Sequence, residues 1–318
     1  MHKFIIQITN IIFFADKNKI FAHFFIPLPS HFLNDYITMQ KIATFIICAL
    51  LVIGCTTKSE SDKKTIYVTI TPLQNIIQEI TMGDFDVEVI VPKGASPETF
   101  EPTPKQVTAF SDAEFIFSTG LIDFEQSLVQ RIGGDAEVVN LSKDIELIAG
   151  SCSHGNHQHK HGVDPHIWTS PRALRTMVTN AHAAIMAHYP DSVKYTNATE
   201  QLLQRLDTLD NFCATRIETE GVEAMMIYHP AYTYYARDYG IEQIAIEHDG
   251  KEPSLRQTTA LIEKAKEHNI KAILRQPQYS EDKVRAIAND TGAEIITTDP
   301  LSEDILSEIE RVTEIICR

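Results

Sequence analysis

The sequence predicts an α/β protein with two lobes, each a mostly parallel sheet with flanking helices, joined by one long rigid helix. Three observations support this fold class. Short apolar runs alternate with helical segments in the first half of residues 65–190, a pattern typical of α/β folds. The same alternation returns over residues 221–318. Between these stretches, residues 191–220 contain no Pro or Gly, so a single uninterrupted helix is expected there.

The N-terminal lobe is predicted to span residues 65–190. "KTIYVTITPLQNIIQEI" begins as a strand and continues as a helix, and "FDVEVIVPKG" alternates before it stops at Pro-Lys-Gly. "TPKQVTAFSDA" is a short helix, while "EFIFSTG" and "AEVVNLS" are strands. The first of these two is apolar throughout, as in strands buried inside a parallel sheet. "SPRALRTMVTNAHAAIMAHYP" is helical and ends at Pro190.

The connecting helix is predicted over residues 191–220, with Asp191 as its N-cap and Gly221 as its stop signal. At about 1.5 Å per residue it would be roughly 45 Å long, enough to run along both lobes. An ordinary long surface helix is the alternative. After it, strands are expected in "VEAMMIYHPA", "IEQIAIEHDG", "IKAILRQPQ" and "AEIITTDPL", with helices between them and at the C-terminus.

The segment upstream of the lobes has the pattern of a bacterial lipoprotein leader. Residues 39–54 combine a basic residue, Lys41, with an apolar run that is too short to span a membrane. "VIGC" resembles a lipobox, which makes Cys55 the predicted lipidation site. Residues 55–64 would then be a polar tether, and residues 1–38 an upstream misreading of the start. An ordinary signal peptide or a membrane anchor is the alternative.

Composition limits the class of partner. The chain has 318 residues, 43% of them hydrophobic, and a net charge of −15, which argues against nucleic acid as a partner. The cysteines outside the leader are Cys152, Cys213 and Cys317. A bridge between Cys213 and Cys317 is compatible with an extracytoplasmic location but is not demonstrated by the sequence.

Four residues that follow predicted strands are candidate metal ligands. They are Glu98, His166, His229 and Asp299, two on each side of the connecting helix. Ligands of open α/β sheets bind beyond the carboxyl ends of the strands, so the four could converge in the cleft between the lobes. Two imidazoles and two carboxylates form a suitable shell for a divalent ion such as Zn²⁺. Taken singly, each residue could equally be a core histidine or a loop carboxylate.

Several motifs together resemble those of one family. "GASPETFEPTP", "DPHIW", "YHPAYTYYARDYGI", "KEPS" and "TDPL" occur in this order, as they do in the metal-specific substrate-binding lipoproteins of ABC transporters, the zinc and manganese uptake group. The resemblance covers residues 65–318. It implies two lobes with a metal buried between them, an extracytoplasmic location, and delivery of the ion to a membrane permease.

The resemblance carries over to the candidate ligands one by one. His166, His229 and Asp299 match the second, third and fourth ligand positions of the family. Zinc members commonly have His at the first position, where this chain has Glu98, while manganese members usually have Glu at the third. The mixed set favours Zn²⁺, with Mn²⁺ or Fe²⁺ as the alternative. A shell completed by a neighbour or water instead of Glu98 is a further alternative.

Other polar residues have supporting roles in this interpretation. Glu247 and Gln276, with Tyr279, are candidate supports for the ligands rather than ligands themselves. The loop "HGNHQHKHG" has imidazoles that could bind metal weakly and concentrate it at the cleft. An accidental histidine bias in a solvated loop is the alternative. The histidines of this loop are His154, His157, His159 and His161.

The predicted protein is a monomeric binding protein and not an enzyme. It lacks an HExxH sequence, and a catalytic zinc site would need an open position and a general base. A zinc hydrolase is therefore the weaker alternative from another functional class. A surface adhesin or metal buffer is the third, since related lipoproteins have been described as adhesins.

Overall fold

The computed structural model describes residues 63–134, 136–149, 162–248 and 250–318, together with the backbone of three upstream strands. The chain divides into two compact units, residues 1–62 and residues 63–318. In the first unit, β1 (Ile5–Ile8), β2 (Ile11–Asp16) and β3 (Lys19–Phe24) form an antiparallel sheet in that order. No helix in the described residues has the length and apolarity needed to cross a bilayer.

The N-terminal lobe of the second unit has a parallel sheet of four strands in the order β5-β4-β6-β7. All four residues of β6 are buried, as the apolar "FIFS" predicts for an inner strand. The strands are β4 (Thr65–Val68), β5 (Asp86–Val89), β6 (Phe115–Ser118) and β7 (Glu137–Asn140). The helices are α2 (Thr71–Ile80), α3 (Pro104–Phe110) and α4 (Asp123–Arg131).

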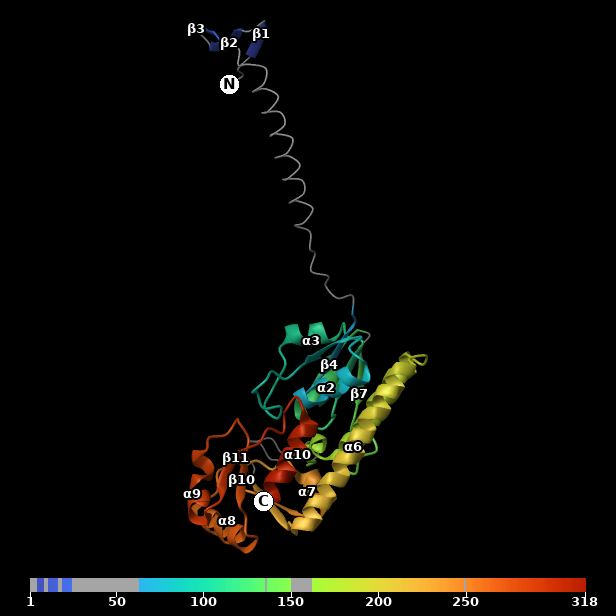
Figure 1. Ribbon diagram of the computed structural model, residues 1–318, viewed down its shortest axis with the longest axis vertical. Coiled ribbons are helices and arrows are strands. Elements are labelled where there is room, and N and C mark those ends of the chain that lie inside the picture. The colour runs from blue at the N-terminus through green and yellow to red at the C-terminus, as the bar shows by residue number, and fades with distance from the viewer. Residues whose placement is uncertain are drawn as a thin grey trace, which may run out of the picture. The chain divides into compact units, whose positions relative to one another are not determined.

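The C-terminal lobe repeats this architecture with strand order β11-β10-β8-β9, again all parallel (Figure 1). Two α/β lobes are therefore confirmed. The strands are β8 (Ala224–Ile227), β9 (Glu242–Ala245), β10 (Ala272–Arg275) and β11 (Glu294–Thr297). The helices are α7 (Thr233–Tyr239), α8 (Leu255–Glu267), α9 (Asp282–Thr291) and α10 (Ile305–Ile316).

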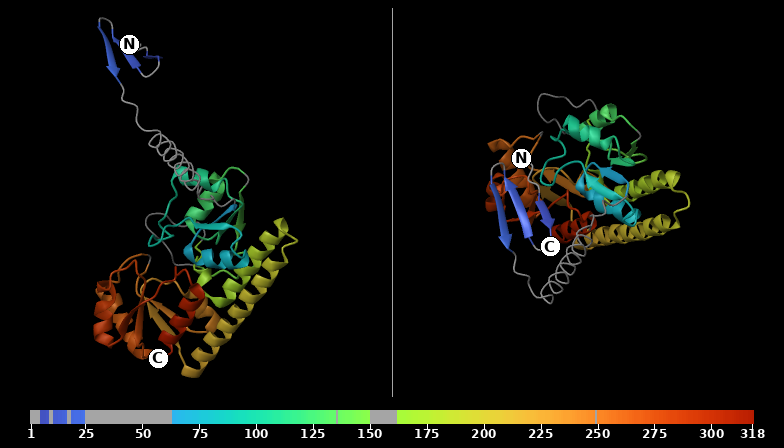
Figure 2. Two further views of the ribbon diagram at one scale, coloured as in Figure 1. Left: turned by 45° about the horizontal axis from the view of Figure 1, so that its top comes forward. Right: turned by 90° about the horizontal axis from the view of Figure 1, so that it is seen from above.

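The connection between the lobes begins with the short 3₁₀ turn η1 (Ile167–Thr169) and α5 (Pro171–His188). It continues as α6 (Val193–Glu220), a helix of 28 residues that lies alongside both lobes (Figures 1 and 2). The helix starts two residues after the predicted Asp191, and Ser192 is its N-cap. It ends at Gly221, whose φ of 62° places this residue in the left-handed region that glycine tolerates best.

One hydrophobic core continues through both lobes. The same cluster includes Ile66 and Phe117 of the N-terminal sheet, Leu206 of α6, and Leu274 and Ile309 of the C-terminal lobe. A second, smaller cluster lies within the C-terminal lobe. The helix α6 contributes buried leucines to this shared core and packs against both α2 and α10. Cys213 and Cys317 are buried free thiols in this region, so no bridge joins them.

Candidate metal centre

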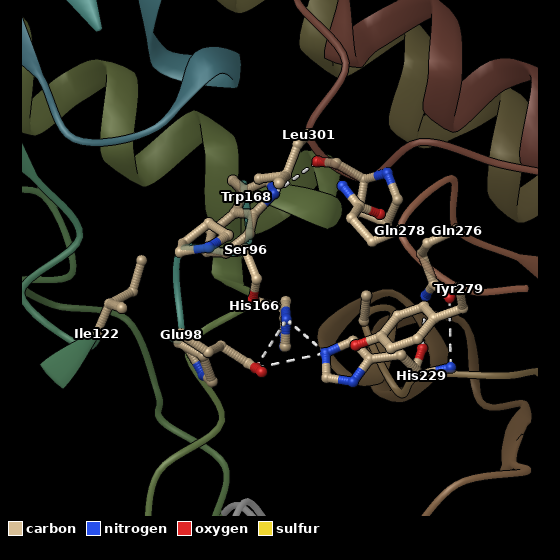
Figure 3. Close-up of a pocket in the computed structure, with 14 residues that line it drawn as sticks. Ser96, Glu98, Ile122, His166, Trp168, His229, Gln276, Gln278, Tyr279 and Leu301 are labelled. Carbon is tan, nitrogen blue, oxygen red and sulfur yellow. Dashed lines mark hydrogen bonds and ion pairs between the residues drawn. The ribbon is translucent and has the colours of Figure 1, made fainter. Parts of the chain in front are cut away.

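The site lies between the lobes, at the carboxyl ends of their strands. Glu98 lies on the irregular segment between β5 and α3, and His229 lies two residues after β8. His166 precedes η1, at the point where the chain enters α5. Both histidines are buried, and only 14% of the Glu98 side chain is exposed. Segments distant in sequence therefore bring these three side chains together (Figure 3).

The spacing of the three donor atoms matches a tetrahedral zinc site. Oε1 of Glu98 lies 3.3 Å from Nε2 of His229 and 3.6 Å from Nε2 of His166. The two Nε2 atoms are 3.3 Å apart. Ligand atoms about 2.0–2.1 Å from a zinc ion at tetrahedral angles lie about 3.3–3.4 Å from one another. Within the described residues, no other group of His, Cys, Asp and Glu converges in this way.

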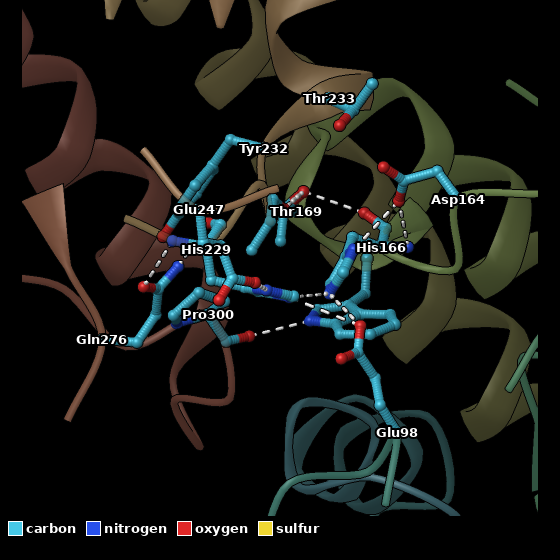
Figure 4. A network of polar contacts seen from close by, with 12 residues as sticks. Glu98, Asp164, His166, Thr169, His229, Tyr232, Thr233, Glu247, Gln276 and Pro300 are labelled. Carbon is cyan, nitrogen blue, oxygen red and sulfur yellow. Dashed lines mark hydrogen bonds and ion pairs between the residues drawn. The ribbon is translucent and has the colours of Figure 1, made fainter. Parts of the chain in front are cut away.

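Each imidazole is oriented by a buried carboxylate. Nδ1 of His166 lies 2.9 Å from Oδ1 of Asp164, which also accepts a hydrogen bond from the His166 backbone N–H. Nδ1 of His229 lies 2.5 Å from Oε1 of Glu247 (Figure 4). A proton held at Nδ1 by a carboxylate directs the lone pair of Nε2 toward the metal and makes it more basic. Asp164 was missed in the sequence, although its place two residues before His166 was a local signal.

Gln276 and Tyr279 hold the backbone and ring of His229. The Gln276 amide donates to the His229 carbonyl over 2.7 Å and accepts from the His229 N–H over 3.3 Å. The Tyr279 ring stacks on the imidazole, with centroids 5.8 Å apart and planes inclined by 26°. Glu247, Gln276 and Tyr279 thus lie where supports for a ligand would be expected.

The donors face a small cavity of about 50 Å³ with largely apolar walls. Charge interactions are stronger in such surroundings than in water. The walls are made by Ser96, Pro97, Glu98, Ile122, Pro165, His166, Trp168, His229, Ala231, Gln276, Gln278, Tyr279, Pro300 and Leu301.

The electrostatics of the site favour a cation. Burial lowers the pKa of His229, but the neighbouring carboxylates of Glu247 and Glu98 outweigh it and raise this pKa to about 10. Burial raises the pKa of Asp164, yet its contacts with His166 and Thr233 leave that pKa below the usual value. Positive charge at His229 is thus stabilised by two acids, and a divalent ion would supply this charge in place of a proton.

Asp299 is not part of the converging group. Its carboxylate accepts a hydrogen bond from the Leu301 N–H over 3.0 Å, and its own N–H donates to Glu308 over 2.7 Å. The side chain lines a neighbouring cavity of about 200 Å³ rather than the small one. The structure therefore brings together three of the four predicted ligands and places Asp299 beside them.

The histidine-rich segment, with His154, His157, His159 and His161, and the predicted lipidation site Cys55 lie outside the described residues. The two ends of the segment are described. Ala149 and Val163 form an antiparallel bridge, and the Tyr234 hydroxyl accepts from Ile148 N–H and donates to the Asp164 carbonyl. The described residues on both sides of this segment therefore lie next to the carboxylate that orients His166.

Comparison with curated proteins relates this fold and site to zinc uptake. The high-affinity zinc uptake system protein ZnuA of Bacillus subtilis is 31% identical over 279 residues, covering 79% of this chain and 85% of that protein. The zinc-binding lipoprotein AdcA of Streptococcus pneumoniae is 26% identical over 292 residues. That match covers 87% of this chain and 56% of AdcA, so the chain spans about half of the longer relative.

Solved structures of zinc-uptake proteins have the same fold as this chain. A crystal structure of ZnuA superposes with a TM-score of 0.72 at 30% identity, covering 80% of this chain and 98% of that one. The zinc-bound ZnuA-like domain of AdcA, at 20% identity and a TM-score of 0.67, shares the fold. The family model described as the periplasmic component A of the zinc-uptake complex matches residues 66–310. This chain therefore belongs to the ZnuA family of zinc-uptake components.

Proposed function

We propose that this protein captures Zn²⁺ outside the cytoplasm and delivers it to an ABC permease. The observation that carries the proposal is the tetrahedral spacing of Glu98, His166 and His229, with donor atoms 3.3–3.6 Å apart. Each histidine is oriented by its own carboxylate, as in zinc sites generally. Membership of the ZnuA family supports uptake as the purpose of binding.

The donor set supports zinc over harder ions. Two imidazole nitrogens and one carboxylate suit a borderline ion such as Zn²⁺, whereas Mn²⁺ prefers more oxygen ligands. Glu98 makes the set harder than one with three imidazoles, so Mn²⁺ or Fe²⁺ would compete at high concentration. Asp299 stays a predicted fourth ligand. It would join the shell only if its carboxylate left the Leu301 N–H and turned toward the small cavity.

We also propose that the site binds without catalysis. The two carboxylates closest to the imidazoles are Asp164 and Glu247. Both contact Nδ1 atoms, so they orient the histidine rings and are not free to act as a general base. Lipidation at Cys55, weak metal binding by residues 154–161 and a monomeric state are proposed on the sequence and on the lipoprotein name of AdcA.

The role of Glu98 provides the test of this function. In titration calorimetry, the purified protein should bind one Zn²⁺ tightly and Mn²⁺ more weakly. Glu98→Ala should weaken Zn²⁺ binding by roughly a hundredfold or more because it removes one of three converging donors. Glu98→His should restore zinc affinity and lower the relative affinity for Mn²⁺.

Glu101→Ala is the matched control, because Glu101 is an exposed carboxylate on the same segment. It should leave both affinities unchanged. Tight zinc binding by Glu98→Ala would remove Glu98 from the donor set. Absence of zinc binding by the wild-type protein would refute the proposed function itself.

A further inference from the structure

A threonine hydroxyl links the two segments that carry the histidine ligands. Thr169 is the last residue of η1 and is fully buried. Its hydroxyl oxygen lies 2.8 Å from the carbonyl oxygen of His166 and 2.9 Å from that of Ala231. His166 directly precedes η1, and Ala231 lies on the loop after β8, which also carries His229 (Figure 4). One side chain therefore contacts the backbone of one ligand and the loop of the other.

The two contacts of Thr169 have different origins. In helical turns, a threonine hydroxyl commonly donates to the carbonyl three or four residues earlier, and the contact with His166 is of this kind. The Ala231 carbonyl belongs to the C-terminal lobe, 62 residues further along the chain. Since a hydroxyl has one proton to donate, it is shared between these two acceptors. Both carbonyl oxygens are thereby held at hydrogen-bond distance from the same atom.

The backbone at Ala231 is bonded in turn to His229. The Ala231 N–H donates to the His229 carbonyl over 2.8 Å. A chain of hydrogen bonds thus runs from His166 through Thr169 and Ala231 to His229 without passing through the metal-binding atoms. At the other side of the rings, the two Nε2 atoms are 3.3 Å apart. The contacts of Thr169 are therefore suited to hold this separation before an ion binds.

The residue before Thr169 fixes the same turn at a second point. The Trp168 indole N–H donates to the carbonyl of Pro300 over 2.8 Å. Pro300 lies on the loop after β11, so η1 is bonded to two loops at the carboxyl end of the C-terminal sheet. Trp168 fixes the turn against this lobe, while Thr169 also contacts the backbone of a ligand. We therefore expect Thr169 to act on the geometry of the site.

We propose that Thr169 is a positioning residue that sets the distance between the imidazoles of His166 and His229, and with it the preference of the site for a tetrahedral ion. This inference rests on the proposed function, because it requires that the two histidines bind Zn²⁺. Ligands held in place beforehand do not have to be ordered when the ion arrives. Without the hydroxyl, two buried carbonyls lose a donor, and the two segments should separate slightly.

A wider separation should affect different ions to different extents. Zn²⁺ favours four ligands in tetrahedral geometry, whereas Mn²⁺ favours octahedral sites rich in oxygen, in which water can complete the shell. A looser pair of imidazoles should therefore weaken the binding of Zn²⁺ more than that of Mn²⁺. The expected signature of Thr169 is a change in the ratio of the two affinities, in addition to any loss of stability.

The test is Thr169→Val, which keeps the shape of the side chain and removes the hydroxyl. In titration calorimetry, this variant should bind Zn²⁺ about tenfold more weakly than the wild type, and its ratio of Zn²⁺ to Mn²⁺ affinity should fall about threefold or more. Co²⁺ reports the geometry directly, because tetrahedral Co²⁺ absorbs visible light much more strongly than octahedral Co²⁺. The absorption of the Co²⁺-loaded variant should be weaker than that of the wild type.

Thr199→Val is the matched control. The Thr199 hydroxyl donates to the Tyr195 carbonyl over 2.7 Å within α6, and Thr199 is 3% exposed. This substitution therefore removes a buried hydroxyl from a residue that does not line the small cavity. It should lower the melting temperature but keep the wild-type affinity ratio and Co²⁺ spectrum. The same change of ratio and spectrum in Thr199→Val would show that the effect is a general one on stability.

Thr169→Ser and Thr169→Ala keep the proposal falsifiable even where the valine variant folds poorly, because the two differ only in the hydroxyl. Thr169→Ser should keep the wild-type affinity ratio and Co²⁺ spectrum, and Thr169→Ala should lose both. Equal ratios in the serine and alanine variants, or wild-type values in Thr169→Val, would overturn the positioning role. Failure of the wild-type protein to bind Zn²⁺ would instead refute the proposed function.

Discussion

A histidine lies between two carboxylates at each end of the C-terminal sheet, and among the described residues only one of the two belongs to a group with the spacing of a metal site. At the carboxyl end, His229 has Glu247 at Nδ1 and Glu98 at Nε2, all largely buried. At the amino end, His268 has Glu223 at 3.8 Å from Nδ1 and Glu242 at 3.5 Å from Nε2. Glu223 is 82% exposed, and the adjoining cavity is larger, about 280 Å³.

The comparison shows that the presence of His and Glu alone does not determine whether a metal can bind. At His229 one nitrogen is used for orientation, and the other converges with a second imidazole and a carboxylate. At His268 each ring nitrogen also faces a carboxylate, but at 3.5–3.8 Å, and no second imidazole joins them among the described residues. Convergence and burial, rather than the presence of His and Glu, therefore distinguish a metal site from a surface ion pair.

The largest expected effect separates the two histidines directly. A complete zinc site contributes about 10–16 kcal/mol, so loss of one ligand should cost roughly 3–4 kcal/mol, a few hundredfold to a thousandfold in affinity. His229→Ala should show this loss in titration calorimetry while circular dichroism remains native. His268→Ala should keep wild-type affinity. Equal effects of the two substitutions would contradict the comparison.

Replacement of an orienting carboxylate should lower zinc affinity less than loss of a ligand does. Glu247→Gln should weaken zinc binding about tenfold to a hundredfold, because the amide is a poorer acceptor for the Nδ1 proton of His229. Glu242→Gln is the control, because Glu242 is the carboxylate nearest to Nε2 of His268 and begins β9, the strand that precedes Glu247. It should leave zinc affinity unchanged. A wild-type affinity in Glu247→Gln would show that the contact at Nδ1 does not tune the ligand.

The smallest expected effect, counted per pH unit, is the change of zinc affinity with pH. Since the pKa of His229 is raised to about 10 in the metal-free protein, this imidazole is protonated at neutral pH and must lose a proton when zinc binds. Zinc affinity should therefore rise by up to about tenfold per pH unit from pH 7 toward pH 10. Calorimetry in buffers of different ionisation enthalpy should detect proton release, which His268→Ala should not alter. A flat profile above pH 7 would show that His229 is already neutral there.

The strand ends were predictable because buried apolar runs such as "FIFS" and "AMMI" define where strands stop. His229, two residues after β8, follows from that placement. His166 precedes η1 and Glu98 lies nine residues after β5, so for these two the family motifs were the stronger signal. The orientation of side chains was not predictable. Nothing local indicates that Asp299 hydrogen-bonds to Leu301 and lines the cavity next to the one that the donors face. The nearness of Asp164 to His166 in the sequence is a signal for an orienting carboxylate, but an acid before a proline is equally typical of turns.

The irregular segment 90–103 has a further consequence for release of the cargo. His166 directly precedes η1 and His229 lies two residues after β8, whereas Glu98 lies farther from regular structure, nine residues after β5 and six before α3. A docking partner that displaced this segment would remove Glu98 and leave the ion with two of its three ligands. Unloading would then need no separation of the lobes, and the long helix could stay straight throughout the transport cycle.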